Sequence, residues 1–176
     1  MRNTNKVGGG ARTNVNGLHF EQTTELRDVF EKHKDFVVFG DNVYYKDNQG
    51  VPIATLYQKH SLYKNLLTPK GVDYKKIISK KLLPDDAILV HETNTLFIIE
   101  KKFQSGAGSV DEKLQTCDFK KKEYIKLLSP IHISVEYCYY LSDWFLQPEY
   151  DDVKEYINSV GCHYFFNEIP LDFLGL

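Results

Sequence analysis

The sequence of 176 residues lacks several features that would place it in a familiar class of protein. No apolar run approaches the roughly 20 residues that span a membrane, and no basic-plus-apolar secretory signal opens the chain. The three cysteines, Cys117, Cys138 and Cys162, are odd in number and have no Cys-x-x-Cys spacing, which disfavours a disulfide framework and a structural zinc site. We therefore expect a soluble protein of the reducing cytoplasm with no membrane partner.

The motifs of several common enzyme classes are also missing. The six histidines include no His-x-x-x-His pair, which disfavours a zinc hydrolase. There is no Gly-x-Ser-x-Gly nucleophile elbow, no dinucleotide-binding fingerprint and no internal repeat. The glycines at positions 8–10 are not followed by Gly-Lys-Ser/Thr, so they do not form a phosphate-binding loop. Residues 1–17 are predicted to be a flexible arm instead.

The length and composition fit one globular domain, which we place at residues 18–176. The net charge of −2 conceals a strong segregation of charge along the chain. Residues 57–81 contain seven lysines and one acid, whereas residues 142–176 contain seven acids and one lysine. One face is therefore expected to be basic enough to follow a phosphate backbone. An ordinary solvated, lysine-rich helix would have the same composition.

Two short apolar runs, residues 87–90 and 96–99, are separated by a polar turn and predict a β-hairpin. The second run is apolar on both faces, as expected of a strand in the middle of a sheet. It ends in Glu100-Lys101-Lys102. Charge beside a buried run is costly unless it is paired or binds a metal, so this strand end is the candidate site.

The register of the hairpin decides which carboxylates meet. Side chains alternate along a strand, so Glu100 and Lys102 share one face and Lys101 takes the other. Directly opposite residues of an antiparallel pair point the same way. A turn with an even number of residues therefore places Asp85 beside Glu100, and an odd number places Asp86 there. In either register two carboxylates and an ammonium group converge, a set that suits Mg²⁺ or Mn²⁺.

Pro84-Asp85, a gap of fourteen residues and then Glu100-Lys101-Lys102 resemble the PD-(D/E)xK signature of metal-dependent nucleases. The wider sequence, residues 98–104 followed by 108–115, resembles type II restriction endonucleases within that superfamily. The resemblance implies an α/β fold with a restriction-endonuclease-like αβββαβ core, in which helices flank a mixed central sheet. A surface hairpin that ends in solvated charges is the alternative.

The resemblance also implies a chemistry. Asp85 (or Asp86), Glu100 and the backbone carbonyl of Lys101 would bind one or two Mg²⁺ ions, for which Mn²⁺ would substitute. Lys102 would position or help to deprotonate the attacking water. The implied activity is that of a homodimeric type II restriction endonuclease, which hydrolyses double-stranded DNA at a specific short sequence. Two alternatives remain: a structure-specific or repair endonuclease, and a non-catalytic DNA-binding module on the same fold.

A third carboxylate candidate, Glu21, lies near the start of a helix predicted for residues 18–34. Residues 16–21 resemble the N-terminal element of some restriction enzymes, in which a glutamate reaches the metal site. The resemblance therefore makes Glu21 a metal ligand and part of the catalytic set. An exposed glutamate in a first helical turn, where the helix dipole favours acids, is the alternative.

The segment after the hairpin carries the candidate DNA contacts. Ser109 and Glu112 form a Ser-x-x-Glu capping box, which predicts a helix from there to about Leu128, with Lys120 and other lysines on or near its open side. A helix N-terminus close to the hairpin would help to hold a phosphate. The candidate DNA contacts are Gln104, Ser109, Lys113 and Gln115.

The remaining elements follow from periodicity and turn residues. We expect strands within residues 36–57, two helical pieces between 60 and 79, and a strand at 131–145. A helix from Pro148 to about Gly161, with Tyr156 facing inward, and a last strand at 162–166 complete the order. The apolar tail is expected to pack on the core or on a second subunit.

Overall fold

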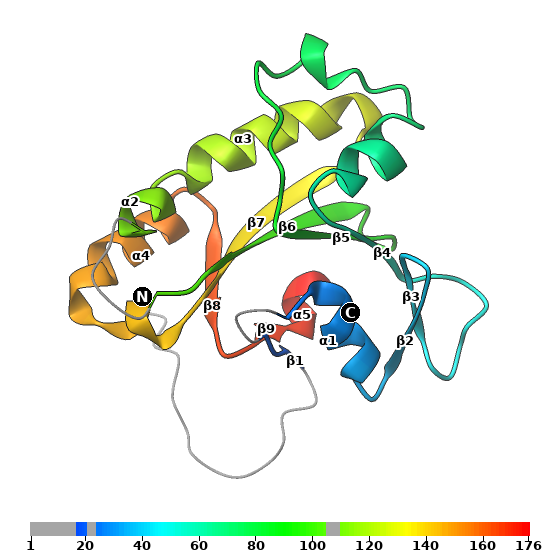
Figure 1. Cartoon of the computed structure of the whole chain (residues 1–176), viewed down its shortest axis with the longest axis horizontal. Helices are drawn as coiled ribbons and strands as arrows, with labels where there is room; N and C mark the ends of the chain where they lie inside the picture. The colour runs from blue at the N-terminus through cyan, green and yellow to red at the C-terminus, as the bar shows by residue number, and fades with distance from the viewer. Residues whose placement is uncertain (1–16, 21–23, 105–109) are drawn as a thin grey trace.

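The structure, a computed structural model, describes residues 17–20, 24–104 and 110–176. A seven-stranded sheet forms its centre, in the order β2-β3-β4-β5-β6-β7-β8 (Figure 1). Neighbouring strands from β2 to β6 are antiparallel, whereas the β6–β7 and β7–β8 pairs are parallel. The strands are β2 (Phe36–Phe39), β3 (Asn42–Tyr45), β4 (Ala54–Tyr57), β5 (Asp86–Val90), β6 (Thr95–Lys102), β7 (Ser134–Leu141) and β8 (His163–Phe166).

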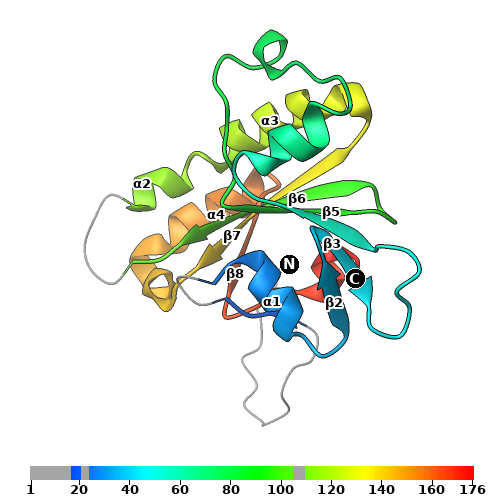
Figure 2. The same ribbon diagram turned by 45° about the vertical axis from the view of Figure 1, so that its right-hand side comes forward.

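Helices cover both faces of this sheet (Figures 1 and 2). On one face, which we call the upper face, lie α2 (Val110–Leu114), α3 (Cys117–Leu128) and α4 (Asp151–Ser159). On the other, the lower face, lie α1 (Leu26–Lys32), α5 (Leu171–Leu174) and a small sheet of β1 (Gly17–Leu18) and β9 (Ile169–Pro170). The order α1, β4-β5-β6, α3, β7 is the expected αβββαβ core, so the α/β fold class with a mixed, helix-flanked sheet is confirmed.

The sheet separates two hydrophobic clusters, because side chains alternate along each strand. In β6, Leu96 and Ile98 face the upper cluster, whereas Phe97 and Ile99 face the lower one. All four are buried, which confirms that β6 is a central strand. Shorter helical segments connect the main elements: a π-helix at Leu62–Leu67 and 3₁₀ turns at Tyr74–Lys76, Ser129–Ile131, Asp143–Leu146 and Pro148–Tyr150.

The structure corrects the N-terminal prediction. Within the described residues, the helix expected over residues 18–34 comprises α1 alone, and Leu18 lies in β1, where it pairs with Ile169. Gly17, expected in the arm, belongs to the same strand. The cause is non-local, since the partner strand lies near the other end of the sequence. Residues 1–16 of the predicted arm lie outside the described residues.

Two further boundaries and the exposure of one side chain differ from expectation. The helix predicted to reach Leu128 is interrupted between α2 and α3, where the Thr116 hydroxyl donates to the Lys113 carbonyl at 2.7 Å. The strand predicted at 131–145 ends at Leu141 and is followed by a 3₁₀ turn. Tyr156, expected to face inward, is 37% exposed. None of the described helices is long and apolar enough to cross a membrane.

Candidate active site

The β5–β6 hairpin settles which aspartate faces Glu100. Val90 pairs with Thr95 and Asp86 pairs with Ile99, so the turn comprises residues 91–94, an even number. Asp85, one residue before β5, therefore lies opposite Glu100 and points to the upper face. Asp86 points to the lower face. Of the two registers that the sequence allowed, the structure has the one that brings Asp85 to Glu100 and Lys102.

The Asp85 carboxylate ends the β5–β6 ladder. Its Oδ2 accepts a hydrogen bond from the backbone N–H of Lys101 at 3.1 Å. The Lys101 N–H therefore donates to a side-chain carboxylate, whereas backbone N–H groups further along the strands donate to backbone carbonyls. This contact orients the Asp85 carboxylate toward the end of β6.

Three oxygen atoms surround the ammonium group of Lys102. Its Nζ lies 3.0 Å from Glu100 Oε2, 3.3 Å from the Lys101 carbonyl oxygen and 3.7 Å from Asp85 Oδ2. The Glu100 side chain is 7% exposed and the Asp85 side chain is 40% exposed, so the group opens toward solvent on the Asp85 side. The hairpin end therefore concentrates two carboxylates and one carbonyl around a single positive charge.

A second lysine, Lys120 of α3, contacts the same carboxylate. Its Nζ lies 3.4 Å from Glu100 Oε2. The sequence predicts Lys120 on or near the open side of its helix, whereas the structure directs it toward the sheet. Its spacing was a usable signal: Lys120 follows the buried Cys117 by three residues and precedes the buried Tyr124 by four, which places it beside the buried face.

The opposite side of the hairpin carries a separate ion pair. Lys101 Nζ lies 2.7 Å from Asp86 Oδ2 and donates to the Thr24 carbonyl at 2.8 Å. Asp86 Oδ1 accepts from the backbone N–H of Leu26 at 3.4 Å, at the start of α1. Burial raises the pKa of Asp86, and its contact with Lys101 acts against that rise. This pair attaches α1 to the hairpin and lies across the sheet from Glu100.

Strand β7 holds the surroundings of the site in place. The Tyr139 hydroxyl donates to the Lys113 carbonyl of α2 at 3.1 Å, and the Tyr140 hydroxyl donates to the Phe20 carbonyl at 2.9 Å. Ser142, just after β7, donates its backbone N–H to the Lys102 carbonyl at 3.0 Å. One strand therefore fixes the end of β6, the helix above it and the segment below it.

Neutral phenols line the buried side of Glu100. Burial, with the negative charge of Glu100 as the next cause, raises the pKa of Tyr124 and of Tyr137. Both phenols therefore stay protonated beside the carboxylate at physiological pH. Among the residues that the structure describes, only Lys102 and Lys120 form ion pairs with Glu100.

The donor set fits a hard divalent cation. Mg²⁺ and Mn²⁺ prefer carboxylate and carbonyl oxygens. Asp85, Glu100 and the Lys101 carbonyl supply three such oxygens around one cationic centre, the ammonium of Lys102. No group of three or more His, Cys, Asp or Glu side chains that would hold a metal occurs within the described part of the chain. The candidate set is thus two carboxylates and a backbone oxygen.

The other predicted site residues are distributed differently. Glu21 and Ser109 lie outside the described residues, so their predicted roles stay predictions. The backbone of Gln104 exchanges hydrogen bonds with the Ser142 hydroxyl, which places it at the exit of β6. Lys113 is exposed on α2.

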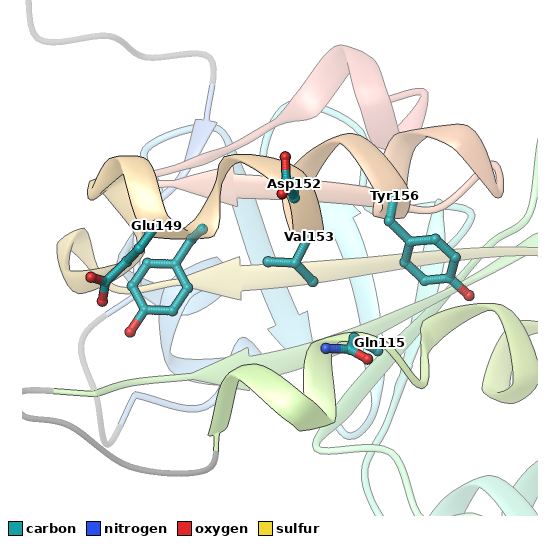
Figure 3. A pocket seen from close by; sticks show the side chains of 6 residues that line it. Gln115, Glu149, Asp152, Val153 and Tyr156 are labelled. Atoms are coloured by element: carbon teal, nitrogen blue, oxygen red, sulfur yellow. The ribbon is translucent and has the colours of Figure 1, made fainter.

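Gln115 lies in a pocket of about 560 Å³ between α2 and α4 (Figure 3). The pocket is lined by Gln115, Glu149, Tyr150, Asp152, Val153 and Tyr156. None of Asp85, Glu100 and Lys102 belongs to this lining. Two acidic side chains, Glu149 and Asp152, belong to the same lining and make this pocket unfavourable for a phosphate.

No protein-family model and no curated protein matches the sequence. Among solved structures, the fold is similar to that of the MunI restriction endonuclease in complex with cognate DNA, with a TM-score of 0.40 and 16% sequence identity. The match covers 70% of this chain and 78% of that one.

Proposed function

We propose that this protein is a divalent-metal-dependent endonuclease that hydrolyses phosphodiester bonds of double-stranded DNA, and that it is a type II restriction endonuclease acting at a specific short sequence as a homodimer. The observation that supports the chemistry best is the convergence of Asp85, Glu100 and the Lys101 carbonyl on the ammonium of Lys102. The sequence resemblance to PD-(D/E)xK nucleases supports the choice of substrate.

Asp85, Glu100 and the Lys101 carbonyl would hold the metal, with Glu21 as a further ligand. A bound Mg²⁺ or Mn²⁺ ion supplies Lewis acidity, which acidifies water and offsets negative charge on the phosphate. The residues of the chain then have three tasks: to hold the cation, to place the water and to balance charge.

Lys102 is suited to the second and third tasks. In the structure, its ammonium lies among the oxygens that would bind the cation. With those oxygens bound to a cation, the ammonium of Lys102 would be free to face the phosphate. There it positions the attacking water and stabilises the pentavalent phosphorus. In this hydrolysis the water would lose a proton and form a P–O bond, the P–O3′ bond would break, and O3′ would take up a proton, which gives a 5′-phosphate and a 3′-hydroxyl.

Lys120 contributes a second positive charge at Glu100. In a site with little exposure to solvent, the total positive charge of two ammonium groups and a divalent cation exceeds the negative charge of two carboxylates. The excess positive charge favours a phosphodiester anion as the group that enters the site. Lys120 is therefore proposed to help to draw the scissile phosphate toward Glu100.

A cleavage assay tests this proposal. Purified protein is incubated with plasmid and phage DNA, with Mg²⁺, with Mn²⁺ or with EDTA, beside Lys102→Ala. Lys32→Ala is the matched control, because Lys32 is an exposed lysine at the end of α1 on the other face of the sheet. We expect metal-dependent, discrete DNA fragments from the wild type and the control, and none from Lys102→Ala.

Other outcomes would change the assignment. A smear, or cutting at junctions only, would indicate a structure-specific or repair endonuclease. DNA binding without cleavage in any metal would indicate a non-catalytic binding module. Cleavage by Lys102→Ala at the wild-type rate would refute the proposed site.

A further inference from the structure

The segment between β4 and β5, residues 58–84, extends beyond α3 on the upper face of the sheet (Figures 1 and 2). We call it the β4–β5 segment. It contains one acidic residue, Asp73, whose side chain accepts the backbone N–H of Lys75. Its seven lysines are Lys59, Lys64, Lys70, Lys75, Lys76, Lys80 and Lys81. The segment therefore carries a local charge of +6.

The lysines of this segment differ from most of the described lysines elsewhere, of which only Lys32, Lys34, Lys46 and Lys113 form no ion pair with a carboxylate. Seven lysines elsewhere form ion pairs with carboxylates: Lys101, Lys102, Lys120, Lys121, Lys122, Lys126 and Lys154. Within the described chain, no lysine of the β4–β5 segment forms such a pair. Positive charge without an internal partner is thus concentrated here.

One of the seven has a structural role. Lys81 Nζ lies 4.6 Å from the centre of the Tyr63 ring and 4.7 Å from that of Tyr74, and the two rings meet edge to face. Such cation–π contacts hold the ammonium in place. The other six lysines are exposed. They are the ones available to a partner.

The base of the segment is firmly attached to the domain. Leu62, Tyr63, Leu66 and Leu67 belong to the same hydrophobic cluster as Tyr124, Leu127 and Leu128 of α3. The Tyr63 hydroxyl donates to the Leu82 carbonyl at 2.7 Å and accepts the Leu82 N–H at 3.0 Å. Lys59 donates its backbone N–H to the Pro84 carbonyl at 2.9 Å. The charged surface therefore has a fixed position relative to Asp85, the next residue.

We propose that the exposed lysines of the β4–β5 segment bind the phosphate backbone of the DNA duplex that enters the Asp85–Glu100 site. This inference rests on the proposed function and adds a docking surface to it. Six unpaired ammonium groups repel one another in the free protein, and a polyanion relieves that repulsion. A duplex carries one negative charge per about 1.7 Å of axis and releases counterions where lysines meet its phosphates. The segment also leads directly into Asp85, a residue of the site suited to phosphate chemistry.

The test measures DNA binding in the Lys102→Ala background without metal, so that cleavage plays no part. Fluorescence anisotropy gives the Kd for a duplex of about 30 base pairs over a range of salt concentrations. The test variant is Lys75→Gln/Lys76→Gln in the segment. The matched control is Lys32→Gln/Lys34→Gln, which removes the same charge from exposed lysines near the end of α1.

We expect the test variant to weaken binding about ten-fold near physiological salt and to lower the slope of log K against log[salt] by about 2, which is about 1 per lost phosphate contact. The loss should be the same for different DNA sequences, because phosphate contacts carry no base information. The control should change the slope by less than about 0.5.

Equal slopes for test variant, control and background would overturn the proposal. Tighter binding of an RNA duplex, or of an acidic polypeptide, that the same two lysines control would also overturn it in favour of that partner. The result is separable from the proposed function. If the wild type cleaves DNA and the slopes are unaltered, the proposed nuclease function stands and this docking surface is rejected. If DNA binding depends on these lysines but no cleavage occurs, the docking surface stands and the nuclease function is rejected.

Discussion

Replacing Lys101 with methionine should destabilise the protein by about 3–5 kcal/mol, because it leaves the Asp86 carboxylate charged and buried. The Asp86 side chain is 3% exposed, and Lys101 Nζ lies 2.7 Å from it. The same change removes the hydrogen bond from Lys101 to the Thr24 carbonyl, which is worth about 1 kcal/mol. Methionine matches the lysine side chain as far as Cε and lacks only the ammonium group, so loss of packing adds little.

The pH dependence follows from the direction of the pKa shift. Burial raises the pKa of Asp86 above its ordinary 3.8, and Lys101 opposes that rise. Without Lys101 the pKa rises further, and the carboxyl group takes up a proton more readily. A group with a raised carboxyl pKa contributes full stability below its ordinary value, and the contribution is lost as the pH rises through the folded-state value. Lys101→Met should therefore be closer to the wild type at about pH 5 than at about pH 8.

Urea unfolding followed by circular dichroism measures these effects in Lys101→Met, Asp86→Asn and the double variant. The double variant should be more stable than Lys101→Met by about 2 kcal/mol or more, because no buried charge is left unpaired. Lys122→Met is the control: its ion pair with Asp118 is also 2.7 Å long but is exposed, so the free energy of unfolding should hardly change. A cost below about 1 kcal/mol for Lys101→Met at both pH values, or a double variant no better than the single one, would refute the reasoning.

Three further outcomes are expected. Asp85→Asn should abolish metal-dependent DNA cleavage, and cleavage by this variant would contradict the role of Asp85 as a metal ligand. Its thermal midpoint should stay within about 3 °C of the wild type, because the half-exposed Asp85 carboxylate contributes less than about 1 kcal/mol to the free energy of unfolding. Tyr63→Phe should lower the free energy of urea unfolding by about 1–3 kcal/mol, since both of its bonds to Leu82 are lost, and an unaltered midpoint would contradict this. Burial raises the pKa of Tyr63 from 10.0 to about 12. The contribution of Tyr63 to the free energy of unfolding should therefore be complete below about pH 10 and fall as the pH rises toward 12. Equal urea midpoints at pH 8 and 10.5 would argue against this pKa shift.

The candidate site was predictable where its determinants are local. Alternation along β6 alone separates Glu100 and Lys102 from Lys101, and an apolar hairpin around a short turn leaves only Asp85 or Asp86 as the facing carboxylate. The choice between these two needed the length of the turn, 91–94, which sequence patterns assign poorly. The structure supplied that one number.

Features that depend on contacts between distant segments were missed. Leu18 has a helical pattern after it, yet it forms a strand because Ile169 pairs with it. Lys120 belongs to a helix with many lysines, and although its spacing places it beside the buried face, it is the packing of α3 on the sheet that brings it to Glu100. Tertiary packing overrides local preference in both cases.

The small β1–β9 sheet has a consequence for the order in which the chain is made. Leu18 leaves the ribosome early, but its partner Ile169, and the buried Leu171 and Leu174 of α5, follow some 150 residues later. The lower face of the sheet, including the side on which Asp86 and Lys101 hold α1, is therefore closed last. Residues 86–102 of the β5–β6 hairpin are synthesised long before this, but the lower face cannot be completed until residue 174 has been synthesised.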